Sequence, residues 1–199
     1  MSEELYINYF AILGLNEDSK AGDIRKNYKK MMKDLLLEIH NLSSLTPAQL
    51  DEYLLKMAML NAGYYILRDD ERRNNYLMHR KKVIELEKKW CEVAEKDPDS
   101  QEADRLRREY DRALQDFLTK YMEELVLEAG RDRECVETSN WDPFHERHAS
   151  RVLRHYRQKL YSQIHERLPY YDVTKPQIDW DERKRIVVSI VRKDYSEDE

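Results

Sequence analysis

The chain has 199 residues, of which 38% are charged and 41% are hydrophobic. It contains only four glycines and five prolines, so a sandwich or barrel of many short strands is disfavoured. Basic and acidic residues number 35 and 40, which excludes the strong positive charge of a typical nucleic-acid-binding domain. No apolar run approaches the roughly 20 residues that span a bilayer, and the acidic start Met1-Ser2-Glu3-Glu4 is unlike a signal peptide. We therefore expect an all-α, cytoplasmic protein without a transmembrane segment.

The first 79 residues predict several helices in close succession. An apolar segment from Tyr6 to Leu13 ends at Gly14. The next helix is expected from about Ala21 to His40, because apolar residues recur there with helical spacing; they are Ile24, Tyr28, Met31/Met32, Leu35 and Ile39. Thr46 can cap a third helix, and Pro47 suits its first turn. This third helix is expected to bury Leu50, Leu54, Met57, Leu60, Tyr64 and Leu67.

The rest of the chain predicts a C-terminal helical bundle. A charged turn, Asp69 to Arg73, leads into a helix over about 76–95, and residues 96–100 form the clearest linker. A strongly amphipathic helix is expected over about 101–129; its apolar stripe is Ala103, Leu106, Tyr110, Ala113/Leu114, Phe117/Leu118, Tyr121 and Leu125. Gly130 is expected to end this helix. Residues 131–141 are expected to be irregular, and another helix is expected over about 143–168.

The last segment is ambiguous. Residues 179–193 suit a helix, which we favour, but the β-branched run from Ile186 to Val191 also suits a strand. We divide the chain into an N-terminal domain, residues 1–79, and a C-terminal antiparallel helical domain, residues 80–199. Cys91 and Cys135 are expected to be free thiols in a reducing compartment, rather than a disulfide or a metal-binding pair.

Two stretches within residues 5–79 resemble the J-domain of DnaJ-type co-chaperones. The first is Asn8-Tyr9-Phe10-Ala11-Ile12-Leu13-Gly14-Leu15, followed by Asp23-Ile24-Arg25-Lys26-Asn27-Tyr28-Lys29-Lys30. The family pattern is D-Y-Y-x-I-L-G-V and then E-I-K/R-K-A-Y-R-K. The second runs from Leu60-Asn61-Ala62-Gly63-Tyr64-Tyr65 to Tyr76 and is similar to I-N-E-A-Y-x-V-L-S-D-P-x-K-R-x-x-Y. The resemblance implies a J-like helical domain, whereas residues 80–199 resemble no family that we recognise.

The resemblance also identifies a missing motif. J-domains carry a His-Pro-Asp tripeptide in the loop after their second helix, and in the family this motif drives ATP hydrolysis by the seventy-kilodalton heat-shock chaperone. Two placements stay open here: Leu36-Leu37-Glu38 or, with a longer helix, His40-Asn41-Leu42. Neither contains proline followed by aspartate. The chain therefore resembles a J-like protein that has lost its ATPase-stimulating motif.

The second helix keeps the basic face that J-domains dock on an acidic surface of the chaperone ATPase. This basic face consists of Arg25, Lys26, Lys29, Lys30 and Lys33. These side chains either form an ordinary solvated helix face or contact a protein partner. Docking through them would mainly steer and orient the partner, and it would weaken as salt is added.

We therefore expect a non-enzymatic J-like scaffold or interaction protein that needs no cofactor. The first alternative is a co-chaperone that still binds the heat-shock chaperone. The second is a metal-dependent enzyme built on a stripe of histidines. Its ligands would be His145, His148 and His155, with Cys135, Glu134 or His165 as the fourth. No known metal spacing is matched, so histidines flanking an apolar stripe are the simpler interpretation. Self-association through the C-terminal helices stays open.

Overall fold

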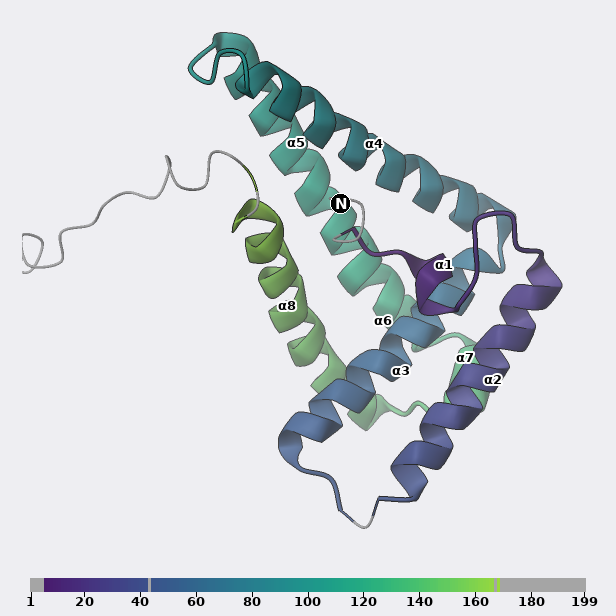
Figure 1. Ribbon diagram of the computed structural model, residues 1–199. Coiled ribbons are helices and arrows are strands. Elements are labelled where there is room, and N and C mark those ends of the chain that lie inside the picture. Colours follow the sequence, from purple (N-terminus) through teal and green to yellow (C-terminus); the bar gives the residue numbers. More distant parts are fainter. Residues whose placement is uncertain (1–5, 43, 167, 169–199) are drawn as a thin grey trace, which may run out of the picture. The chain divides into compact units, whose positions relative to one another are not determined.

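The computed structural model describes residues 6–42, 44–166 and 168. The chain divides into two compact units, Met1–Ile164 and His165–Glu199, and the fold described here is that of the first. The predicted all-α class is confirmed, because every regular element of the described residues is helical (Figure 1). None of these helices is long and apolar enough to cross a membrane. In chain order they are α1 (Tyr9–Ile12), α2 (Ala21–His40), α3 (Pro47–Leu67), α4 (Asp70–Ala94), α5 (Gln101–Thr119), the π-helical turn η2 (Lys120–Glu124), α6 (Leu125–Ala129), α7 (Arg133–Ser139) and α8 (Pro143–Glu166).

Polar side chains set the start of α3 and α5 where the sequence predicts them. The hydroxyl of Thr46 accepts a hydrogen bond from the backbone N–H of Gln49, whose side chain accepts one from the backbone N–H of Thr46. This capping box satisfies two donors that a helix start leaves unpaired. Ser100 caps α5 through the backbone N–H of Ala103. The predicted bounds of α2 are also confirmed.

The helix expected to start near residue 76 begins earlier, at Asp70. The side chain of Asp69 accepts a hydrogen bond from the backbone N–H of Arg72, so the charged residues expected to form a turn make the first turn of α4 instead. Asp70 and Glu71 lie in that turn, where the positive end of the helix dipole favours carboxylates.

The short helix α1 lies in the core against α3. Tyr9, Phe10 and Leu13 are fully buried. Gly63 of α3 permits their close approach, since a Cβ at this position would lie 3.3 Å from the ring of Tyr9 and 3.4 Å from Leu13. The apolar segment near the N-terminus therefore packs within the helical core.

Residues on both sides of position 79 share this core. The hydroxyls of Tyr6 and Tyr110 are 2.7 Å apart, and the hydroxyl of Tyr9 donates to the backbone carbonyl of Tyr121. In the hairpin of α4 and α5, the rings of Trp90 and Tyr110 stack with centroids 5.6 Å apart. The expected boundary at residue 79 thus falls inside one compact unit, and the division into two domains stays a prediction.

A π-helical turn shifts the register of the helix expected over 101–129. This turn, η2, buries the neighbouring side chains Tyr121 and Met122. One extra residue per π-helical turn moves the following side chains around the helix axis. As a result Val126 is buried in α6, whereas Leu125 is half-buried. The predicted stripe is therefore wrong at its last position.

The expectation of an irregular segment over 131–141 is also wrong, because this segment contains α7. Asp132 caps α7 by accepting a hydrogen bond from the backbone N–H of Cys135 at 3.1 Å. Asn140 ends it in the left-handed conformation, with a φ of 54°. Only Cys135 and Ser139 of α7 are buried, so this helix has no apolar stripe that periodicity could detect.

The remaining predictions concern the cysteines and the C-terminal part of the chain. Both cysteines are free, as predicted; Cys91 is half-buried and Cys135 is buried. The helix expected over 143–168 is α8, which ends at Glu166. The segment over 179–193 lies outside the described residues.

Candidate functional site

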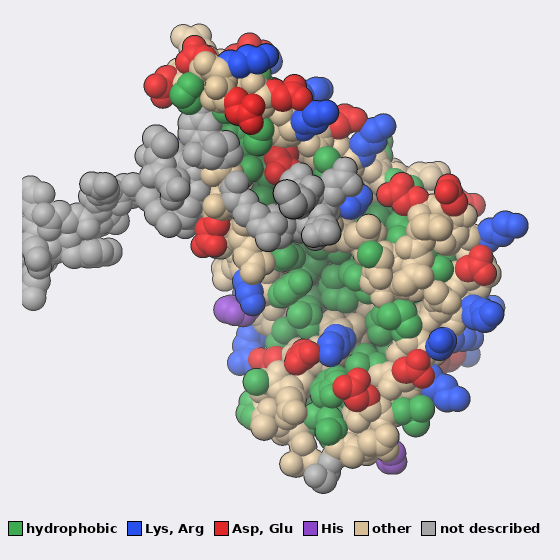
Figure 2. All heavy atoms as spheres, viewed as in Figure 1, with side chains coloured by type: hydrophobic (Ala, Val, Ile, Leu, Met, Phe, Trp, Pro, Cys, Tyr) green, Lys and Arg blue, Asp and Glu red, His purple; other side chains and the backbone are tan. Residues whose placement is uncertain are grey.

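The basic face of α2 is exposed along its whole length. Lys and Arg side chains line the outer edge of this helix, at the right of Figure 2. The opposite side of α2 faces α3 and buries Ile24, Tyr28, Met32 and Leu35. Each of the five predicted cations, Arg25, Lys26, Lys29, Lys30 and Lys33, is accessible to solvent.

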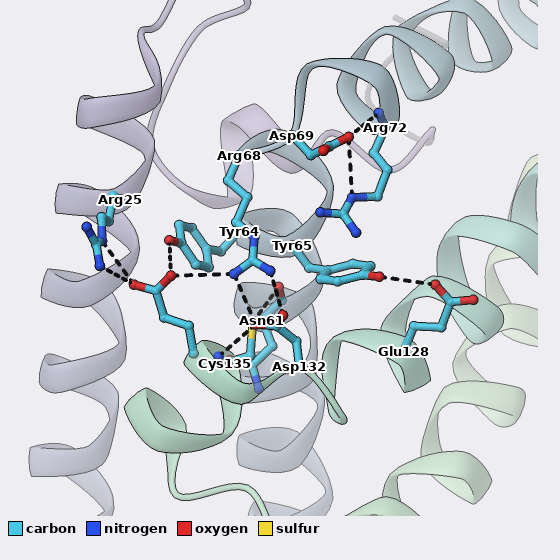
Figure 3. Close-up of polar contacts among 11 residues, drawn as sticks. Arg25, Asn61, Tyr64, Tyr65, Arg68, Asp69, Arg72, Glu128, Asp132 and Cys135 are labelled. Atoms are coloured by element: carbon cyan, nitrogen blue, oxygen red, sulfur yellow. Dashed lines mark hydrogen bonds and ion pairs between the residues drawn. The ribbon is translucent and has the colours of Figure 1, made fainter.

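A carboxylate from α7 binds part of this basic face. Arg25 donates from Nε and Nη2 to Oε1 of Glu134, at 2.9 and 2.7 Å (Figure 3). The Nζ atom of Lys29 lies 3.6 Å from the same oxygen. Two of the predicted cations are therefore paired with an acidic residue of the same chain.

The second oxygen of Glu134 belongs to a network at the end of α3. It accepts a hydrogen bond from the hydroxyl of Tyr64 at 2.7 Å and lies 3.5 Å from Nη1 of Arg68. Arg68 also makes a two-pronged ion pair with Asp132, at 3.0 and 2.5 Å, and its guanidinium lies over the ring of Tyr64. Figure 3 shows this network joining α2, α3 and α7. Such bidentate contacts fix geometry as well as charge.

These contacts hold both carboxylates ionised. The Tyr64 hydroxyl, followed by the Arg25 guanidinium, holds the pKa of Glu134 below its usual value. For Asp132, burial raises the pKa, but hydrogen bonds from Arg68 and from the backbone N–H of Cys135 outweigh burial, and the net pKa is lowered. Ionised acids therefore face the basic residues of α2 and α3 at neutral pH.

Beneath this network, a buried polar chain fastens α7 to the core. Asn61 of α3 is 1% exposed. Its side chain accepts a hydrogen bond from the hydroxyl of Tyr28 at 2.8 Å and donates to Ser139 at 3.0 Å. Burial raises the pKa of the Cys135 thiol to about 12, so this thiol is protonated and unreactive at neutral pH. These buried hydrogen bonds attach α7 firmly to α3.

Three of the predicted cations stay available to a partner. Lys26, Lys30 and Lys33 are exposed, and no ion pair joins them to any other described residue. They are spaced by four and three residues, which places them on one stripe of α2. Beside the C-terminal half of α2 lies a cleft of about 540 Å³, lined by Lys29, Lys33, Leu36, Leu37, Ile39, His40, Thr138 and Asn140.

The end of α2 bears on the two placements of the missing motif. Residues 36–38 lie inside the helix, and Glu38 accepts a hydrogen bond from the hydroxyl of Tyr53 at 2.9 Å. His40 is the last helical residue and Asn41 is the C-cap. The position after the helix is therefore occupied by Asn41 and Leu42, without proline or aspartate.

The histidine stripe does not gather into a metal centre. His148 of α8 lies within hydrogen-bonding distance of Asp51, and His145 accepts from the backbone N–H of Asp142 at 3.2 Å. His155 is exposed. Nowhere in residues 6–42, 44–166 and 168 do three or more His, Cys, Asp or Glu side chains lie close enough to hold a metal ion.

Sequence reasoning finds the basic face but not its internal partner. Glu134 lies 109 residues beyond Arg25 in the sequence, in a segment expected to be irregular. No local pattern links the two positions, and only the docking of α7 brings them together. Asp132 carries one usable signal, because an aspartate three residues before Cys135 could cap a short helix. No family model, curated protein or solved structure matches the chain.

Proposed function

We propose that the chain is a non-enzymatic interaction protein whose J-like N-terminal part, residues 1–79, docks on an acidic surface of a partner protein. The lysine stripe of α2, defined as Lys26, Lys30 and Lys33, is the contact surface. The observation that carries the proposal is the state of this stripe: the three side chains are exposed and without an ion pair among the described residues, while the neighbouring Arg25 and Lys29 are paired with Glu134.

The lysine stripe would act by steering and orientation. Positive side chains on one helix face attract an acidic surface from a distance and set the direction in which it approaches. Such contacts weaken as salt shortens the range of the charges. The residues at the end of α2 contribute no proline or aspartate to the contact, so the docked partner is held without a signal for ATP hydrolysis.

The test uses the full chain and the cognate seventy-kilodalton heat-shock chaperone, with binding and ATP turnover measured separately. The triple variant Lys26→Glu/Lys30→Glu/Lys33→Glu removes the lysine stripe. The control variant Lys82→Glu/Lys89→Glu/Lys96→Glu makes the same charge change at exposed lysines elsewhere. We expect salt-sensitive binding that is lost in the first variant, kept in the second and not accompanied by faster ATP hydrolysis.

Three other results of these binding and ATP-turnover measurements would change the proposal. Stimulated turnover would show a true co-chaperone that works without His-Pro-Asp, and the non-stimulating function would be abandoned. Equal loss of binding in both triple variants would show a general charge effect and remove the assignment of the lysine stripe. Absence of binding to the chaperone would exclude the co-chaperone alternative and direct the search to a different acidic partner.

A further inference from the structure

An apolar groove lies between α2 and α3, on a different side of α2 from the lysine stripe. Its volume is about 580 Å³. Figure 2 shows hydrophobic side chains gathered in a hollow on this face, with both acidic and basic side chains beside them. The apolar lining comes from four helices and consists of Ile12, Met31, Leu35, Leu55, Met59, Leu60 and Tyr156. Clefts of roughly 300–1,000 Å³ with a mostly apolar lining are typical of binding sites.

The charges at the rim of this groove leave it negative. Asp34 and Glu38 of α2 line one side, and Lys56 of α3 is the only cation among the described lining residues. Lys56 is already paired with Glu52, at 2.9 Å. Asp34 has no ion pair with any described residue. A ligand in the groove therefore meets an apolar floor with two carboxylates, Asp34 and Glu38, on one side and a single lysine, Lys56, that is already paired.

The apolar lining residues of the groove lie along two neighbouring helices. Met31 and Leu35 are one turn apart on α2, and Leu55 and Met59 are one turn apart on α3, so two apolar ridges flank the floor. Helices that bind such grooves insert apolar residues spaced by three or four positions. The two methionines are flexible and polarizable, which lets the floor adjust to different side chains.

We propose that this groove binds an amphipathic helix of a partner protein, with an apolar stripe on the floor and Lys or Arg residues facing Asp34 and Glu38. This site is independent of the lysine stripe, which attracts acidic surfaces. One helix, α2, thus presents two contact faces of opposite charge preference.

The experiment measures fluorescence anisotropy of synthetic peptides titrated with the full chain. One helix-forming peptide of about 18 residues carries leucines at helical spacing and lysines beside them; its mate carries glutamates in place of the lysines. We expect the lysine peptide to bind at least about tenfold more tightly than the glutamate peptide. The variant Leu55→Asp should weaken its binding about tenfold or more, while Met78→Asp, at an exposed apolar residue of α4, should leave binding unchanged.

A charge-swap variant separates recognition from loss of folding. In Asp34→Lys/Glu38→Lys the preference should reverse, so that the glutamate peptide binds more tightly; a merely unstable protein would lose both. Equal binding of the two peptides by the native chain, or an unchanged preference in the swap variant, would overturn the proposal. A dimer that Leu55→Asp dissociates, seen by sedimentation, would overturn it too, because a second copy would then be the occupant.

Discussion

At position 130 a neighbouring side chain, rather than the backbone conformation, requires a glycine. Gly130 ends α6, as predicted, but its φ of −66° is one that any residue adopts. Its constraint is space: a Cβ would lie 2.7 Å from Nε1 of Trp141 and 3.3 Å from the carbonyl oxygen of Leu127. Trp141 is itself 5% exposed and has little room to move.

We therefore expect Gly130→Ala to destabilise the protein by about 1–3 kcal/mol, the usual range for overpacking. Gly22→Ala is the matched control, since no atom lies within 4 Å of a Cβ there. This change should be neutral or stabilising by up to about 1 kcal/mol, because alanine restricts the unfolded chain. Urea unfolding monitored by circular dichroism gives both free energies. Equal stability of the two variants would show that Trp141 yields easily.

At the scale of the single element, η2 determines which side chains of α6 point inward. A straight α-helix would keep Leu125 on the buried stripe that Tyr121 continues. The π-helical turn brings Met122 and Val126 inward in its place. A local change in the hydrogen-bonding pattern, five residues long, therefore alters the core composition of the next helix.

This register shift predicts an inverted order of mutational cost. Val126→Ala removes two buried carbons and should cost about 2 kcal/mol, whereas Leu125→Ala removes three half-exposed carbons and should cost about 1 kcal/mol or less. Both free energies of unfolding come from urea titration. If Leu125→Ala proves the more costly change, the helix continues without the π-helical turn.

The short helix α7 should lose part of its attachment in acid. The pKa values of Asp132 and Glu134 are lower in the folded chain than in the unfolded chain. Their ionic contribution is therefore complete above the unfolded values near pH 4, and it is lost as the pH falls through the folded values. We expect Asp132→Asn/Glu134→Gln to cost about 1 kcal/mol at pH 7 and progressively less as the pH falls below about 4.

The measurement is the difference in urea unfolding free energy between the native chain and this double variant at both pH values. Asparagine is a good helix cap, so Asp132→Asn tests the charge while keeping the cap. A difference that stays constant from pH 7 to pH 3 would mean that the two carboxylates hold α7 through something other than charge.

The elements differ in how far the sequence predicts them. Long helices such as α2, α3 and α5 carry many periodic apolar residues, and side-chain caps mark the starts of α3 and α5, so the sequence places the start of each closely. The seven-residue helix α7 has a cap, Asp132, but no apolar stripe of its own, because it gains its stability from buried partners such as Asn61. For the same reason, the sequence does not indicate that Glu134 contacts the basic face of α2. A contact between residues far apart in the sequence exists only after the chain has folded.

At the scale of the whole described unit, residues 6–79 and 80–164 form one structure around the tyrosine-rich core. Three tyrosines near the N-terminus and in α4 reach partners in α5 and η2. On the outside, α7 contacts both α2 and α3. The helices after residue 79 therefore do more than extend the N-terminal part: they supply an acid, Glu134, that binds the same face through which we propose partner docking.

This internal acid predicts that weakening it improves docking. In Glu134→Gln the ion pairs to Arg25 and Lys29 are lost, so both cations become available beside the lysine stripe. We expect affinity for an acidic polypeptide, poly-L-glutamate, to rise about two- to fivefold at low salt, the value of one or two exposed ion pairs. The gain should vanish at about 1 M salt, where charges act over only roughly 3 Å.

The control variant Glu137→Gln makes the same charge change on α7, at a residue that pairs with Arg133 instead. An equal gain in this control would trace the effect to net charge, whereas a gain confined to Glu134→Gln would show that α7 competes with the partner for the basic face.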